Sequence, residues 1–88
     1  MNNERRKQLK AIAKQLGTIA DNLEEQQILL EQIYDDKSEA FDNMPESLQE
    51  SDRGIEMEEG IAVLEEQKDA VATMVDDIRD IIETLQDF

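Results

Sequence analysis

The sequence predicts an all-α protein, an antiparallel and coiled-coil-like helical hairpin that dimerises into a four-helix bundle. Of its 88 residues only 3% are aromatic, three are Gly and one is Pro, a composition typical of long helices. Aliphatic residues recur at alternating steps of three and four in both halves of the chain, as in coiled coils. The single proline lies between these halves. A chain of this length forms one domain, residues 1–88, and cannot bury a large core alone.

A first helix is predicted over about residues 4–42. With Leu9 taken as heptad position a, every a residue is leucine until Lys37. The a and d residues are Leu9, Ile12, Leu16, Ile19, Leu23, Gln26, Leu30, Ile33, Lys37 and Ala40. A third apolar row follows position e, with Ala13, Ala20, Gln27, Tyr34 and Phe41. Three rows of seven exceed a two-stranded seam and are typical of a helix in a bundle.

A second helix is predicted over about residues 51–87. With Ile61 as position a, the a and d residues are Met57, Ile61, Leu64, Lys68, Val71, Val75, Ile78, Ile82 and Leu85. Its third row follows position g, with Gly60, Gln67, Met74, Ile81 and Phe88. We expect the two lysines at core positions, Lys37 and Lys68, to extend their ammonium groups outward to solvent.

A turn is predicted over about residues 43–50. Asp42 and Asn43 tolerate turn conformations and can end the first helix. Pro45 disfavours helix at the residue before it and can itself begin a helical turn. Ser47 and Glu50 have capping-box spacing, which predicts that helical structure restarts there. The apolar residues expected to close this end of the core are Phe41, Met44 and Leu48.

The pairing of the two helices can be predicted from their polar interruptions. The preferred register sets Gln26 opposite Lys68 in one polar layer, a known device for fixing alignment. The same register brings Lys14 near Asp80. In a lone hairpin the third apolar rows would face water, which favours burial in a second copy. The expected dimer face is made of Tyr34, Met74 and Ile81.

The net charge of -14 is distributed unevenly. Residues 1–20 hold five basic residues and one acidic residue, a net charge of +4, whereas residues 21–88 hold 22 acidic and four basic residues, a net charge of -18. Such a body repels nucleic acids and membrane surfaces, so the expected partner is a basic protein. The expected partner-binding carboxylates, around the turn, are Asp42, Glu46, Glu50, Asp52, Glu56, Glu58 and Glu59.

The residue types present argue against an enzyme. There is no His, Cys or Trp, so the usual bases, nucleophiles and zinc ligands are missing. Adjacent acid pairs such as Glu58 and Glu59 fall on outer heptad positions, where we expect solvated carboxylates. The acids from Asp35 to Asp42 lack the spacing of a calcium loop. We therefore expect no catalytic residues, no metal and no cofactor. The lack of cysteine also suits a reducing cytoplasm, and no apolar run is long enough for a membrane helix.

The turn carries a resemblance. The segment AFDNMPESLQES, followed by RGIEMEEGIAVLEE, covers residues 40–66. It resembles a group of small acidic helical proteins of phages and prophages that share an FDNMPESLQ signature, then a glycine and an acidic helix. The resemblance implies a phage or prophage product acting in the bacterial host cytoplasm, and it implies no particular activity.

Two functions follow as hypotheses. The first is a protein–protein interaction module that engages a host or phage protein, with DNA mimicry or inhibition of a DNA-binding or defence protein as its most specific form. The alternative is a coiled-coil structural or assembly factor of a phage. Capture of a salt-sensitive basic partner would favour the first, and presence in purified virions would favour the second.

Overall fold

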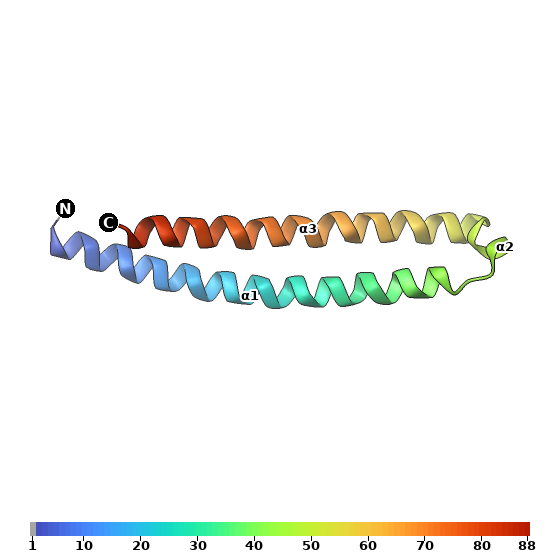
Figure 1. Cartoon of the computed structure of the whole chain (residues 1–88), viewed down its shortest axis with the longest axis horizontal. Helices are drawn as coiled ribbons and strands as arrows, with labels where there is room; N and C mark the ends of the chain where they lie inside the picture. Colours follow the sequence, from blue (N-terminus) through green and yellow to red (C-terminus); the bar gives the residue numbers. More distant parts are fainter. Residues whose placement is uncertain (1) are drawn as a thin grey trace.

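The structure, a computed structural model that describes residues 2–88, is an extended hairpin of two long antiparallel helices (Figure 1). Helix α1 spans Asn3–Asp42, the one-turn helix α2 spans Glu46–Gln49, and α3 spans Asp52–Gln86. The rod measures 68 × 14 × 14 Å. The expected all-α class with two long packed helices is therefore confirmed. The amino-terminal turns of α1 extend beyond the end of α3 (Figure 1).

Each long helix begins at a side-chain cap. Asn2 accepts a hydrogen bond from the backbone N–H of Arg5 at 2.8 Å, and Ser51 accepts one from the N–H of Gly54 at 3.2 Å. Both caps satisfy a backbone donor that the first helical turn leaves free. The acidic residues Glu4 and Asp52 also lie in the first turns of α1 and α3, where the helix dipole favours negative charge. The helix starts are therefore set by local sequence.

The two helices bury different combinations of heptad rows. On α3 the a and d rows face α1, as predicted, and Val75 is 4% exposed. On α1 the prediction was wrong, because the a and e rows form the seam. Ala13 and Ala20 are 2% and 0% exposed, whereas the d-row residues Ile12 and Ile19 are about half exposed. Alanine at position e lets α3 approach closely, and the larger isoleucines are left on the flank.

The predicted polar layer of Gln26 and Lys68 does not form between the helices. The Lys68 Nζ atom lies 5.1 Å from the centre of the Tyr34 ring, and not opposite Gln26, which is exposed. Within residues 2–88, Lys14 makes no ion pair with Asp80. The predicted register was fitted to the a and d rows of α1, and its polar layer used Gln26 of the d row. Since that row lies outside the seam, its polar interruption gives no alignment between α1 and α3.

Candidate interaction surfaces

The loop is held by the side chain of Gln49. Its amide Nε2 donates hydrogen bonds to the carbonyl oxygens of Phe41, at 2.8 Å, and Met44, at 3.1 Å. The last carbonyls of a helix have no partner within the helix, so they need donors from elsewhere. Gln49 supplies such a donor from α2, in addition to the backbone N–H of Met44 that donates to the Phe41 oxygen at 3.1 Å, and thereby holds α2 against the end of α1. The sequence alone gives no signal for this contact.

Gly54 is required where α3 starts. It is buried, and a Cβ atom at this position would overlap the backbone carbonyl oxygens of Leu48 and Gln49. The glycine therefore allows the end of α2 to lie directly on the first turn of α3. The predicted Ser47–Glu50 capping box is wrong, because α2 has no side-chain cap. Ser51 caps α3 instead, and a serine directly before the helical pattern is the signal for such a cap.

The apolar residues of the turn do not all enter the core. Phe41 and Met44 are half-buried, but Leu48 is 50% exposed. The expectation that Leu48 closes the core is therefore wrong for the single chain, because α2 directs this side chain outward. Pro45 is exposed and directly precedes α2, in agreement with its role of starting a helical turn.

The seven carboxylates proposed for partner binding are all exposed, and they fall into two groups. Asp42 ends α1, Glu46 begins α2, Glu50 follows α2, and Asp52 begins α3, so these four surround the loop. The other three, Glu56, Glu58 and Glu59, follow on the first two turns of α3 and occupy heptad positions c, e and f. No ion pair within residues 2–88 involves any of the seven. The loop end therefore carries a cluster of exposed carboxylates without ion-pair partners in the described residues.

One long side of the hairpin is charged, and the contacts of Arg79 show which heptad rows form it. Its guanidinium donates to Asp21 at 3.2 Å and to Glu24 at 2.6 Å. These contacts place row e of α3 on the same side as rows b and f of α1. Further acids occupy these rows, among them Glu31 and Glu65. The hydrogen bonds to Glu24 and Asp21 raise the pKa of Arg79 above its ordinary value.

The opposite side of the hairpin has few charges and is called here the low-charge side. It consists of rows d and g of α1 from residue 8 to residue 40, and of rows g and c of α3 from residue 60 to residue 88. Asp36 and Asp77 are its only charged residues, in a chain that is 36% charged. Its large apolar side chains are each close to half exposed: Ile12, Ile19, Leu29, Ile33, Val63, Met74, Ile81 and Phe88.

Only two of the three residues expected to form a dimer face lie on the same side of the hairpin. Met74 and Ile81 lie on the low-charge side and are 50% and 49% exposed. Tyr34 does not join them, because it belongs to the e row that faces α3 and its ring is contacted by the Lys68 ammonium. That ammonium also pairs with Asp69 at 3.0 Å, and this hydrogen bond is the main reason why the pKa of Lys68 is raised. Lys68 therefore reaches the surface, as expected.

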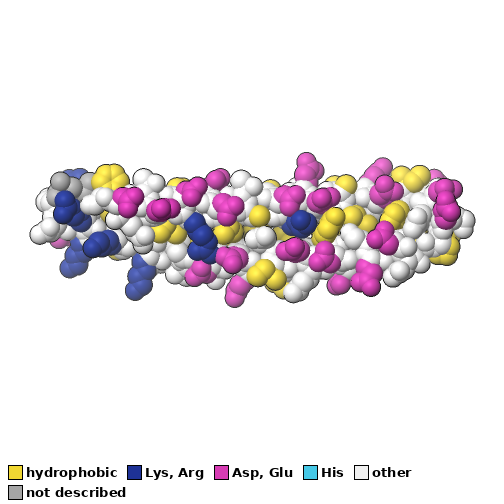
Figure 2. Space-filling view, viewed as in Figure 1, with side chains coloured by type: hydrophobic (Ala, Val, Ile, Leu, Met, Phe, Trp, Pro, Cys, Tyr) yellow, Lys and Arg dark blue, Asp and Glu magenta, His cyan; other side chains and the backbone are white. Residues whose placement is uncertain are grey.

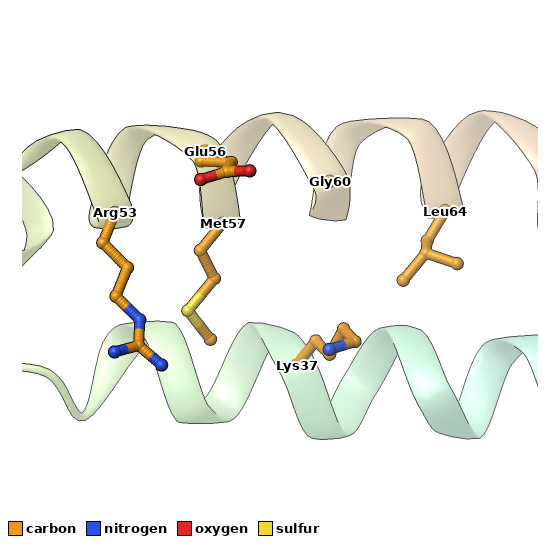
Figure 3. Close-up of a pocket in the computed structure, with 6 residues that line it drawn as sticks. All are labelled: Lys37, Arg53, Glu56, Met57, Gly60 and Leu64. Carbon is orange, nitrogen blue, oxygen red and sulfur yellow. The ribbon is translucent and has the colours of Figure 1, made fainter.

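A groove of about 570 Å³ lies between the helices near the loop (Figure 3). Lys37 lines it from α1, and α3 contributes Arg53, Glu56, Met57, Gly60 and Leu64. Arg53 and Met57 point across towards α1, and Gly60 has no side chain to fill the space between Met57 and Leu64 (Figure 3). Nothing lies within 4 Å of a Cβ placed on Gly60. Lys37 and Arg53 are also the only basic residues between positions 21 and 66.

Basic and acidic side chains are distributed unevenly along the rod. The space-filling view shows most Lys and Arg side chains gathered at the amino-terminal end of α1, others farther along among acidic side chains, and Asp and Glu along most of the rod (Figure 2). No group of three or more potential metal ligands occurs within residues 2–88. In the same range, no helix has both the length and the apolar character needed to span a membrane.

Comparisons of the chain with protein-family models, curated proteins and solved structures gave no match.

Proposed function

We propose that this protein is a small acidic protein–protein interaction module whose partner is a basic host or phage protein. The observation that carries the proposal is the segregation of charge on a narrow rod. Residues 21–66 hold 16 acidic and two basic residues, a net charge of -14. An excess of one sign over so thin a body produces a strong field that attracts an oppositely charged surface and raises the rate of association.

DNA mimicry is the specific form that this charge pattern supports. A rod 14 Å across that carries many unpaired carboxylates offers an alternative ligand to a groove built for the phosphates of DNA. The exposed acids of the loop and of the first turns of α3 would supply this contact. The targets would be nucleases, other DNA-binding enzymes or defence proteins. The resemblance of residues 40–66 to phage and prophage proteins fits such a role in a bacterial cytoplasm.

Self-association is part of the proposal. The low-charge side leaves eight large apolar side chains near half exposure, and a chain of this size gains stability by burying such a surface in a second copy. The resulting homodimer would be a four-helix bundle. Its charged sides would remain outside and available to the basic partner.

A structural or assembly role in the phage particle is the second candidate. The observation that favours it is the uninterrupted length of α1 and α3, 40 and 35 residues, in a rod 68 Å long. Mass spectrometry of purified virions separates the two candidates. A structural component should be present in them, whereas an inhibitor of host proteins should be absent.

The interaction proposal is tested by affinity capture from bacterial lysate at increasing salt concentration. We expect the wild-type protein to retain a DNA-binding protein that is released by salt and displaced by added DNA. A variant with Glu46, Glu50, Glu58 and Glu59 replaced by glutamine keeps side-chain size and should lose most of the capture. The same number of acid-to-amide substitutions far from the loop, at the exposed Asp76, Asp80, Glu83 and Asp87, should lose less. Equal capture by all three proteins would contradict the proposal.

A further inference from the structure

We infer that the groove between α1 and α3 near the loop binds a small molecule with one carboxylate and an apolar body, such as a medium-chain fatty acid. This ligand differs from the basic protein proposed above, and its binding requires neither that partner nor a second copy. Three features of the groove point to it: two cations without ion-pair partners, an apolar wall that lacks one side chain, and surrounding acids that repel larger anions.

The groove collects the cations of an otherwise acidic stretch. Residues 21–66 hold 16 acidic and two basic residues, and both basic residues, Lys37 and Arg53, line the groove. Neither forms an ion pair within residues 2–88. Arg53 extends from α3 towards α1, and Lys37 lies on α1 opposite the stretch between Met57 and Gly60 (Figure 3). Two cations from different helices therefore face one space, where an added carboxylate can accept hydrogen bonds from both.

The remaining wall of the groove is mostly apolar. Met57 and Leu64 lie one heptad apart on α3, with Gly60 between them. Nothing lies within 4 Å of a Cβ placed on Gly60, so the missing side chain leaves open space along the groove. Seven helical residues span about 10 Å, and an extended chain of about eight carbons, with bonds of about 1.5 Å, has a similar length. An alkyl chain laid over Gly60 would therefore contact both apolar side chains.

The order of these residues along α3 sets the direction of the ligand. Arg53 lies nearest the loop, Gly60 follows, and Leu64 is last. The carboxylate would lie beside Arg53 and Lys37, and the alkyl chain would run towards Leu64. Glu56, the one carboxylate of the lining, stays beside the α3 backbone (Figure 3). The volume of about 570 Å³ is within the usual range of ligand sites, about 300–1,000 Å³.

The acids around the groove select a small monoanion over an acidic macromolecule. Charges act over about 8 Å at physiological ionic strength, so the nearest groups dominate. A single carboxylate between Lys37 and Arg53 is attracted by two close cations. An acidic peptide or a nucleic acid would bring further negative charges beside Asp36, Glu56 and the acids of the loop, which repel them. An uncharged ligand would gain nothing from either cation.

An NMR titration with octanoate tests the site, and sedimentation at the same concentrations records any change of oligomeric state. We expect saturable binding of one octanoate per chain, with the largest shifts at the methyl groups of Met57 and Leu64. 1-Octanol has the same chain without the charge and should bind at least fivefold more weakly. Equal affinity for the two compounds, or largest shifts at Ile12 and Ile81, would mean adsorption to exposed apolar side chains and would overturn the inference.

Removal of the two cations tests their role. The double substitution Lys37→Gln and Arg53→Gln should raise the dissociation constant of octanoate at least fivefold. The matched control, Lys10→Gln with Lys14→Gln, makes the same change of net charge at exposed positions away from the groove and should alter the constant less than twofold. Equal effects of the two double substitutions would show that only the net charge matters, contrary to a defined site.

Gly60→Leu tests the apolar part, because its side chain would occupy the space assigned to the alkyl chain. We expect the dissociation constant of octanoate to rise at least fivefold, with helical content unchanged by circular dichroism, whereas Ala11→Leu on the exposed surface of α1 should leave it unchanged. Undiminished binding by a folded Gly60→Leu chain would contradict the assignment. Tighter binding of a peptide with several carboxylates than of octanoate would contradict it as well.

Discussion

The side-chain amide of Gln49 donates to the carbonyl oxygen of Phe41 at 2.8 Å, so a residue of α2 closes the end of α1. A second bond, to Met44, extends this contact through the loop. The turn is therefore an ordered element with its own hydrogen bonds. It holds the four carboxylates that surround the loop in fixed positions at the end of the rod.

Replacing Gln49 with alanine should lower the free energy of unfolding by about 1–2 kcal/mol, because the Met44 carbonyl loses its side-chain donor and the Phe41 carbonyl keeps only the backbone N–H of Met44. Urea unfolding followed by circular dichroism measures the change. Gln32→Ala, on the exposed surface of α1, is the control and should change stability by less than about 0.5 kcal/mol. Equal effects of the two substitutions would show that the Gln49 bonds contribute nothing to stability.

Adding a methyl group at Gly54 should destabilise the hairpin, whereas the same change at Gly17 should stabilise it. A Cβ on Gly54 overlaps the carbonyl oxygens of Leu48 and Gln49, and one on Gly17 meets nothing within 4 Å. Gly17→Ala should then gain about 0.5–1 kcal/mol from its better helix propensity. We expect Gly54→Ala to lose about 1–3 kcal/mol, the usual effect of overpacking. Thermal melts of both variants would contradict this account if they shifted in the same direction.

Enlarging Ala20 tests which rows of α1 face α3. This residue is fully buried, so Ala20→Leu should force the helices apart and cost about 1–3 kcal/mol. Ala11→Leu adds the same atoms on the exposed surface of the same helix and should be neutral within about 0.5 kcal/mol. A seam made of rows a and d would instead place Ala20 on the flank, and the two substitutions would then have equal effects on the melting temperature.

Moderate salt should raise the melting temperature. The charge of -14 between residues 21 and 66 repels itself within one rod, and ions screen that repulsion. The same measurement on the variant with four loop-end glutamates replaced by glutamine should show a smaller dependence on salt. A melting temperature that falls as salt increases would mean that attractive pairs, such as Arg79 with Glu24, outweigh the repulsion.

The hairpin could be predicted from the sequence because its heptad rows and its single proline are local signals. The helices end within one residue of the limits expected for them. The rows of α1 that face α3 could not be predicted in the same way. Three adjacent rows, d, a and e, are apolar, and a single helix gives no reason to prefer d–a over a–e. The choice depends on how closely α3 approaches Ala13 and Ala20, which is a property of the packed pair.

The structure of the loop could likewise be predicted only in part from the sequence. The role of proline at a helix start follows from its fixed backbone, so it could be predicted. The Gln49 contacts join residues that lie five and eight positions apart across a change of chain direction, and no periodic pattern marks them. The positions of Met74 and Ile81 on an exposed face agree with the sequence interpretation. Tyr34 does not lie on that exposed face, because its row, e, packs against α3.

Sedimentation equilibrium of the purified protein tests the central claim most directly, namely that a second copy buries the low-charge side. We expect a mass of twice 10.1 kDa at micromolar concentrations. We also expect Ile19→Glu, which places a charge on that side, to shift the mass to one chain without loss of helix. A wild-type mass of one chain over the whole concentration range would contradict the claim.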